Sequence, residues 1–583
     1  MAALMSGVAF TAMGDIQPGY FGTTSAMSSG KWVKIKVSAT GMQQITPQQL
    51  AEWGFPDPSK VAVCGYGGAA LYLDQVTDNV PDDVKPVPSL YDGKRLMFYG
   101  IADLHYTATR PTENSRWNVT VRRNYYADYG CYFLTDAIQP ETPVNVPFKQ
   151  QYNVSRDEAF SILHVEKEER NPELGARFFF GDLSDAQTHS IPLDLTGYFP
   201  YPDSGLSAGQ SNRASMHVSG VLAYSVNNWG NSRWSINPGG TAQTFSLQRR
   251  DKGECVYEAQ NNMFLANPAA TEDGRYTLDI TLDNVGINYA ALDFIDVTYR
   301  RRTDMVRGGQ QSFIIETGNN ADHINFTNAS ENLAVWDITD SHKPYVYEVD
   351  HGAGNLARIS LQPTVSADRS YLPTLVAFDP ETDLHAVEKA GDVDPQNLHA
   401  LSTPDLVIVS APGFMDQAER LADIHRSKQR MDVVVVDHNI IYNEFSSGTP
   451  SVTGIRRFLR MLYDREPGKL KAVLLLGGCS WDNRNITNFP GAEEYFVPIY
   501  QDQSLISAGY MSRSYATDAI YGMLSDDFST VGRRDSRWSD NLAAQMEISV
   551  GRLPARNAEE CRNMVDKVEA YMNNLPFGDT FSR

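Results

Sequence analysis

The stretch that decides the fold runs from residue 405 to residue 484. It contains three short apolar runs, 405-DLVIVS-410, 431-MDVVVV-436 and 473-VLLL-476. Two segments with helical character separate them, 416-DQAERLADIHRSKQR-430 and 453-TGIRRFLRMLYD-464. Short apolar runs that alternate with amphipathic helices predict a β-α-β-α-β unit with a buried parallel sheet.

The second helical segment has the clearest periodicity, and the stripe that faces the sheet is predicted to be Ile455, Phe458, Leu459 and Leu462. Ligands and chemistry in open parallel sheets gather at the carboxyl ends of the strands. That edge is predicted to carry Ser410, Asp437, His438 and the loop 477-GGCSWDNR-484.

The composition excludes several classes of protein. The 583 residues include 50 basic and 71 acidic side chains, and the net charge of −21 argues against general nucleic-acid binding. No apolar stretch reaches the roughly 18 residues that a membrane-spanning helix needs. The five cysteines show no CxxC spacing, so neither a disulfide framework nor a zinc site is predicted from them.

The chain is predicted to be multidomain. Residues 25–150 read as a β-rich N-terminal domain, beginning with the alternating strand pattern of 31-KWVKIKVS-38. Residues 151–380 carry many short strand-like runs and predict a β-sandwich-like domain. Residues 395–583 form the α/β domain, after a hinge rich in Asp, Pro and Gly.

Both ends of the chain suggest that it is part of a longer protein. Residues 1–24 read as the remnant of a secretory signal followed by a tail, although no basic segment precedes the apolar residues. A fourth strand is predicted at 546-MEISVGRLP-554, and a last helix begins near Asn557 with Glu560 as its capping partner. A parallel-sheet domain that stops soon after this helix looks incomplete.

Two sets of residues at or near the strand ends are candidates for chemistry. Cys479 and His438 each follow a predicted parallel strand and could form a nucleophile–base pair, although a turn residue and a strand cap explain them more simply. Asp482, Asp526 and Asp527 could supply oxygen ligands to calcium, but without EF-hand spacing solvated loop acids are the simpler interpretation.

A resemblance to one family rests on several runs taken together. They are 65-GYGG-68, 95-RLMFYG-100, 125-YYADYGCYFLT-135, 291-ALDFIDVTYRR-301, 335-VWDITD-340, 397-NLHAL-401, 440-IIYNEFSSGTPSVTGIRRFLRMLYD-464, 477-GGCSWDNR-484 and 550-VGRLPARNAEE-560. From about residue 25 to residue 583 the chain resembles the gingipain-type cysteine peptidases. It is most similar to the signal peptidase/sortase branch that serves the type IX secretion system of Bacteroidetes.

The resemblance implies a caspase-like α/β catalytic domain behind β-rich domains, located outside the cell or at the outer membrane. It implies a His–Cys dyad that removes the C-terminal sorting domain from exported cargo. The acyl group would then pass to an amine of surface lipopolysaccharide. It further implies an outer-membrane β-barrel partner and no required cofactor, with calcium as an option.

The chain departs from the family pattern at two places. The family's histidine lies in a Gly-His-Gly setting, which this sequence lacks, so the dyad is expected beyond Arg583 and the 583 residues are expected to be inactive alone. Gly478 stands where family members often have an acid. Asp482, Asn483 and Arg484 match, and they are expected to shape the loop beside the site by hydrogen bonding.

Two further functions remain open at this point. The first is a gingipain-like secreted endopeptidase that hydrolyses its substrates. The second is a non-catalytic surface protein that uses its β-sandwich to bind protein or glycan. A pair formed by Cys479 and His438 is the alternative for catalysis within this chain.

Overall fold

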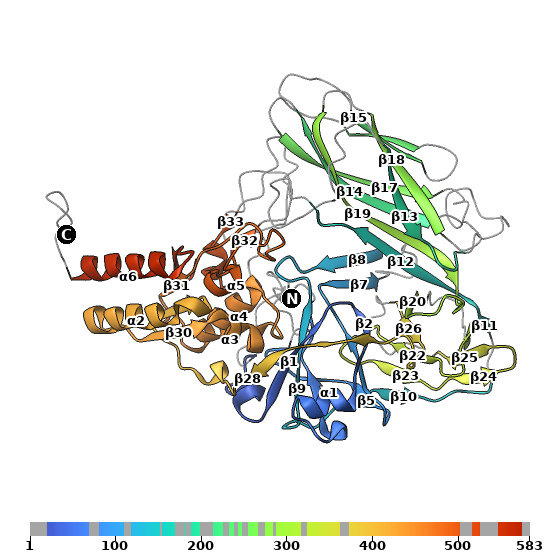
Figure 1. The fold of residues 1–583 in the computed structure, drawn as a ribbon, viewed down its shortest axis with the longest axis horizontal. Helices are drawn as coiled ribbons and strands as arrows, with labels where there is room; N and C mark the ends of the chain where they lie inside the picture. Colours follow the sequence, from blue (N-terminus) through green and yellow to red (C-terminus); the bar gives the residue numbers. More distant parts are fainter. Residues whose placement is uncertain are drawn as a thin grey trace, which may run out of the picture.

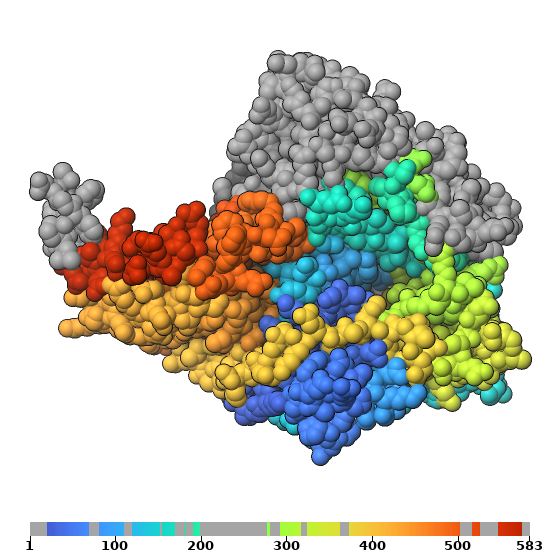
Figure 2. All heavy atoms as spheres, in the orientation of Figure 1, coloured from blue at the N-terminus to red at the C-terminus, as the bar shows by residue number. Residues whose placement is uncertain are grey.

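The computed structural model describes residues 20–68, 71, 81–109, 118–151, 154–169, 180, 188–198, 214–224, 232–237, 243–247, 255–265, 275–283, 287–315, 323–361, 372–501, 516–524 and 546–573. They form a multidomain, sheet-rich protein (Figure 1). The C-terminal domain, coloured orange to red, is a lobe that joins the blue N-terminal domain (Figure 2).

The predicted parallel sheet is present in the C-terminal domain. β29 (Leu406–Ser410) pairs in parallel with β30 (Val433–Asp437) on one side and β31 (Ala472–Leu476) on the other. β34 (Ser549–Leu553) pairs in parallel with β31, so the strand order is β30-β29-β31-β34. The prediction of three parallel strands, joined by a fourth near residue 550, is confirmed.

Helices cover this sheet, namely α2 (Met415–Gln429), α3 (His438–Phe445), α4 (Val452–Arg465) and α6 (Ala558–Met572). α2 packs beside α6, and α3 packs against α4 (Figure 1). The predicted stripe on α4 is confirmed, because Ile455, Phe458, Leu459 and Leu462 are all fully buried. Asn557 caps α6, whereas the Glu560 carboxylate accepts from the N–H of Arg556 and not from that of Asn557.

Two sheets with a shared core form the centre of the N-terminal domain. Their strand orders are β28-β1-β9-β3-β4 and β27-β2-β6-β5, and Ile35, Phe98 and Leu134 are among the apolar residues buried between them. The strands are β1 (Trp32–Val37), β2 (Gly41–Ile45), β3 (Ala62–Cys64), β4 (Pro86–Val87), β5 (Ser89–Tyr91), β6 (Leu96–Gly100), β9 (Gly130–Thr135), β27 (His385–Ala386) and β28 (Glu388–Val393). The last two show that the chain returns to this domain after building the next one.

The middle domain is dominated by a nine-stranded sheet. Its strands, in spatial order, are β10 (Val144–Val146), β23 (Tyr345–Tyr347), β22 (Ala334–Asp337), β26 (Thr374–Phe378), β20 (Gln311–Ile314), β12 (Glu158–Glu166), β19 (Ile287–Arg302), β14 (Ala214–Tyr224) and β17 (Cys255–Leu265). A second sheet contains β11 (Ser155–Arg156), β21 (His323–Phe326), β25 (Leu356–Ser360) and β24 (Asp350–Gly352), and a third contains β13 (Thr188–Asp194), β18 (Arg275–Asp283), β15 (Ser232–Asn237) and β16 (Gln243–Leu247). Phe313 and Val335 of the large sheet share one core with Ile324 and Ile359 of the second sheet, which is sandwich-like packing.

The loop between α3 and α4 fixes the C-terminal domain to the N-terminal domain. The Ser447 hydroxyl donates to the carbonyl of Cys131 and accepts from the N–H of Tyr66, both at 2.9 Å. The Thr449 hydroxyl accepts from the N–H of Cys131 at 3.0 Å and donates to the carbonyl of Gly67. Both hydroxyls are buried, and they supply to β9 the hydrogen bonds that β3 no longer makes after Cys64.

No helix among the described residues is both long enough and apolar enough to cross a membrane.

Replacement of Ser447 by Ala should loosen this attachment. Two buried backbone groups would lose their partner, at a cost of about 1–3 kcal/mol. We expect a lower unfolding temperature and faster amide exchange at Tyr66, whose N–H donates to the Ser447 hydroxyl. Ser427→Ala, at an exposed position of α2, is the control and should change stability by no more than about 0.5 kcal/mol. Equal behaviour of the two variants would contradict the role given to Ser447.

Candidate functional site

The candidate site lies where the parallel strands end. β31 is followed by Gly477, whose N–H donates to the carbonyl of Leu553 at the end of β34. The next residue, Gly478, forms a short parallel bridge with Phe496. A Cβ on Gly478 would come within 2.8 Å of the Phe496 ring, so a larger residue at this position would force the ring to shift.

Arg552, on β34, is the centre of the hydrogen-bonding network beneath this loop. Its guanidinium donates to both carboxylate oxygens of Asp518 at 2.7 Å. It also donates to the backbone carbonyls of Gly477, Gly478, Val497 and Pro498, at 2.9 to 3.2 Å. Burial alone would lower the pKa of Arg552, but the hydrogen bonds to Asp518 outweigh burial and raise it, so the side chain stays charged.

Asp482 and Asn483 hold the rest of the loop in place. The buried Asp482 carboxylate accepts from the N–H groups of Ile486 and Thr487 at 3.0 and 2.7 Å, and from the Thr487 hydroxyl. The Asn483 side-chain amide donates to the carbonyl of Ile499 and accepts from its N–H. Both side chains therefore shape the backbone by hydrogen bonding.

Arg484 leaves the loop and contacts the middle domain. Its guanidinium pairs with both carboxylate oxygens of Glu168, and its own side chain is 1% exposed. Glu168 also pairs at 2.8 Å with Arg123 of β8 (Asn118–Arg123), a strand that pairs with β7 (Leu104–Thr109). The Glu168 carboxylate of the middle domain thus links Arg484 of the site loop to Arg123 of β8.

The same network continues to His164 on β12. Arg123 pairs with Glu166 at 2.9 Å, and Glu166 contacts Nε2 of His164 at 2.8 Å. Nδ1 of His164 contacts Asp296 at 2.7 Å. Burial alone would lower the pKa of His164, but these two carboxylates outweigh it and raise the pKa to about 9. His164 is therefore an imidazolium at neutral pH.

Cys479 and His438 lie at the predicted edge of the sheet but make no hydrogen bond to each other within the described residues. Nε2 of the buried His438 ring lies 3.1 Å from the carbonyl of Phe496, and its Nδ1 lies 4.0 Å from Asp437. Burial lowers the pKa of His438, so the ring is neutral at physiological pH. Burial also raises the pKa of the Cys479 thiol, against the opposing effect of Arg552. These are not the surroundings of a reactive thiolate.

Of the other candidate site residues, Ser410 and Asp437 make local hydrogen bonds, and Asp482 holds a turn. The Ser410 hydroxyl donates to the carbonyl of Ala411, and Asp437 caps α3 by accepting from the N–H of Asn439. Asp526 and Asp527, the calcium candidates, lie outside the described residues, and Asp482 is fully engaged in its turn.

The sequence patterns did not identify Arg552 and Asp518 as residues that hold the site loop. A signal was present, because an arginine within the short apolar strand 546–554 is unusual and implies a buried partner. The partner could not be identified, since Asp518 is separated from Arg552 by more than 30 residues of polar sequence.

Two comparisons with known proteins agree with the resemblance in sequence. Residues 399–582 match the profile of peptidase family C25. The structure of dimeric latent PorU from Porphyromonas gingivalis aligns with a TM-score of 0.77 and 26% identity, over 94% of this chain and 50% of that chain. This chain therefore spans about half the length of that PorU chain. No curated protein sequence matches it.

Other solved structures align poorly and carry no argument. The coat protein of Tobacco streak virus aligns at a TM-score of 0.14 and 10% identity, over 24% of this chain and 87% of that chain. A β-porphyranase from Bacteroides plebeius has the same TM-score at 14% identity, over 38% of each chain. The resemblance to the gingipain-type family and to PorU is confirmed by the first two comparisons.

Replacement of Arg552 by Lys should release the site loop. A lysine keeps the charge, but one ammonium group cannot reach Asp518 and four carbonyls together. We expect a loss of about 3 kcal/mol in stability, and faster amide exchange over residues 477–501. Arg556→Lys, at a side chain that is 64% exposed, is the control and should have no measurable effect. Unchanged exchange in R552K would contradict the central role of the guanidinium.

The ion-pair network that runs from Arg484 through Glu168, Arg123 and Glu166 to His164 should lose stability at alkaline pH. The folded-state pKa of His164, about 9, lies above its ordinary value of 6.5. The stabilisation is therefore complete below about pH 6.5 and is lost as pH rises through 9, by up to about 3 kcal/mol. In His164→Gln this dependence should disappear. Thermal unfolding between pH 6 and pH 10 measures it, with His425→Gln on α2 as the control that should behave like the unmodified chain.

Proposed function

We propose that this chain is the N-terminal and partial catalytic portion of a secreted cysteine peptidase of the type IX secretion system. The observation that carries the proposal is the joint match of residues 399–582 to peptidase family C25 and of 94% of the chain to PorU. The similarity extends over the β-rich domains as well as the peptidase region, so it reaches beyond a shared catalytic fold. We further propose that the parallel-sheet domain has a caspase-like architecture.

The proposed reaction removes a C-terminal sorting domain from exported cargo proteins. A cysteine thiolate attacks the peptide carbonyl, and the departing amine takes a proton from a histidine. This step leaves a thioester on the enzyme. An amine of lipopolysaccharide then attacks the thioester, which regenerates the thiol and leaves the cargo bound to the surface through an amide bond. The proposed location is the outer face of the outer membrane, beside a β-barrel partner.

The edge of the sheet supports this proposal through its rigidity and its exposed aromatic groups. The loop after β31 is fixed by Arg552, Asp482 and Asn483, so groups placed on it hold a defined position. Trp481 and Phe489 of the same segment are 49% and 43% exposed. We propose that these two aromatic side chains contact the cargo segment next to the cleaved bond.

Deletion of the gene in its natural host tests the function. Cargo proteins should then keep their sorting domains, and mass spectrometry of their C-termini detects this directly. Cargo that is released but not attached to lipopolysaccharide would indicate hydrolysis only, as in an endopeptidase. Cargo processed normally in the deletion strain would contradict the peptidase proposal and favour a non-catalytic surface protein.

The proposal does not use Cys479 and His438 as the reacting pair. In the full-length protein, Cys479→Ala should keep cargo cleavage within about twofold of the unmodified enzyme, because the thiol is protonated and makes no hydrogen bond to His438. Cys561→Ala, at a buried position of α6, is the control for effects on folding. A loss of cleavage of about a hundredfold or more in C479A alone would make Cys479 the nucleophile.

A further inference from the structure

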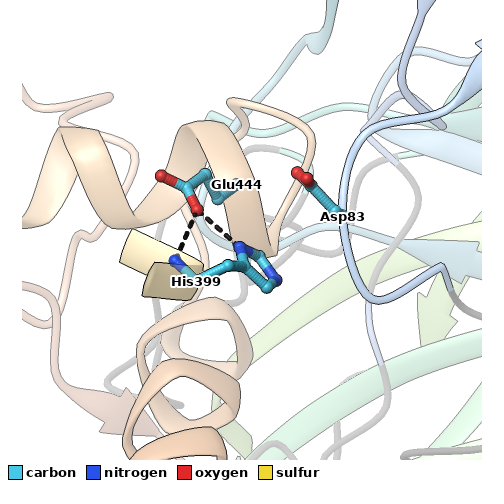
Figure 3. Close-up of side chains that lie close together, drawn as sticks. All are labelled: Asp83, His399 and Glu444. Atoms are coloured by element: carbon cyan, nitrogen blue, oxygen red, sulfur yellow. Dashed lines mark hydrogen bonds and ion pairs between the residues drawn. The ribbon is translucent and has the colours of Figure 1, made fainter. Parts of the chain in front are cut away.

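A buried cluster of three ionisable side chains lies between the N-terminal and C-terminal domains. Asp83 comes from the segment before β4, His399 from a short 3-10 helix (Leu398–Ala400), and Glu444 from α3. Figure 3 shows the three side chains converging from these separate segments. One ligand atom from each lies within 4.8 Å of the other two, and all three residues are buried.

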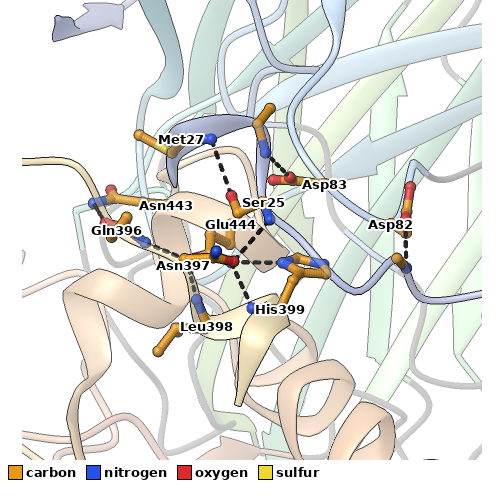
Figure 4. Close-up of polar contacts among 12 residues, drawn as sticks. Ser25, Met27, Asp82, Asp83, Gln396, Asn397, Leu398, His399, Asn443 and Glu444 are labelled. Carbon is orange, nitrogen blue, oxygen red and sulfur yellow. Dashed lines mark hydrogen bonds and ion pairs between the residues drawn. The ribbon is translucent and has the colours of Figure 1, made fainter. Parts of the chain in front are cut away.

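Glu444 is oriented by several donors. Its Oε1 accepts from the N–H of Leu398 at 2.8 Å and from the Gln396 amide at 2.9 Å. Its Oε2 contacts Nδ1 of His399 at 2.5 Å and accepts more weakly from the N–H of the same residue (Figure 4). The hydrogen bonds on Oε1 fix the carboxylate and direct Oε2 towards the imidazole, as supporting groups do for metal ligands.

Asp83 is oriented in the same manner by backbone groups. Its Oδ2 accepts from the N–H of Ala26 at 2.6 Å and its Oδ1 from that of Val84 at 2.7 Å. Each oxygen therefore keeps a lone pair for another partner.

The charges and hydrogen bonds of the cluster are incomplete. Among the described residues, no lysine or arginine pairs with Asp83 or Glu444, so two buried carboxylates face a single imidazole. The His399 ring is 0% exposed and stacks on Phe445, with 4.7 Å between the ring centroids. Its Nε2 has no hydrogen-bond partner in the part of the chain that the structure describes. Two buried carboxylates without a cationic partner are a costly arrangement that a bound cation can relieve.

We propose that Asp83, His399 and Glu444 bind one divalent transition-metal ion, of which Zn²⁺ is the best fit, and that this ion joins the two domains. The donor set of one imidazole and two carboxylates suits zinc, whereas calcium takes oxygen ligands only. Zinc–ligand bonds of about 2.0–2.2 Å place ligand atoms about 3.3 Å apart, so the widest pair must close by no more than about 1.5 Å. The ligand nitrogen is Nδ1, the ring atom that faces Oε2 of Glu444, so binding displaces the proton now held between these two atoms.

Metal titration of the purified 583-residue chain tests the site. After treatment with a chelator, the chain should take up one Zn²⁺ per molecule and unfold at a higher temperature with Zn²⁺ than without it. Ca²⁺ should give neither effect. Co²⁺ should bind at the same stoichiometry and show the visible absorption of a low-symmetry site with nitrogen and oxygen ligands, a readout that needs no variant.

Two neighbouring aspartates supply a matched pair of variants. Asp83→Asn removes a proposed ligand but keeps a hydrogen-bond acceptor, and it should weaken Zn²⁺ binding about tenfold or more. Asp82→Asn changes a carboxylate that accepts from the N–H of Gly22 and pairs with Lys85, and it should leave the affinity unchanged. Uptake of less than half an ion per chain, or equal affinities of the two variants, would overturn the proposal and leave a proton-bridged domain contact.

Discussion

The C-terminal domain depends on one buried guanidinium. Arg552 enters from β34 of the parallel sheet. With Asp518 as its counter-ion, it holds four backbone carbonyls of the connection that follows β31 at the carboxyl edge of that sheet. The carbonyls of such loops cannot pair with one another, so a planar group with several donors is the simplest way to satisfy them in the interior. The position of Cys479, the turn at Asp482 and the route of Arg484 all follow from the loop that this side chain fixes.

The architecture of the C-terminal domain could be predicted because each of its elements carries a local pattern. Runs such as Val433–Val436 are too apolar for an exposed strand, and the spacing of Ile455, Phe458 and Leu462 is that of a helix on a sheet. The handedness of β-α-β connections limits the strand orders that such a unit can adopt, but the order β30-β29-β31-β34 came from the structure. Gly478 could be noticed as a departure from the family pattern, although the Phe496 ring that a larger residue would shift became visible only in three dimensions.

The electrostatic part of the structure could not be predicted, because its partners are far apart in the chain. Arg484 and Glu168 are separated by 316 residues, and Lys34 reaches Asn443 over 409. Neither composition nor periodicity carries information about such pairs. Loop acids and histidines looked alike in the sequence, yet two neighbouring carboxylates keep His164 charged at neutral pH, whereas burial keeps His438 neutral. Chemistry at the domain junctions is thus decided by tertiary placement rather than by residue type.

The return of β28 to β1 has a consequence for how this protein must be made. β1 pairs with β9 on one side and with β28 on the other, and β28 follows the whole middle domain in sequence. During synthesis or export, the outer edge of β1 therefore stays open until residues 388–393 emerge. An open edge is a template for pairing with other chains. The nascent protein should need protection over that interval, and a chaperone that covers Trp32–Val37 would supply it.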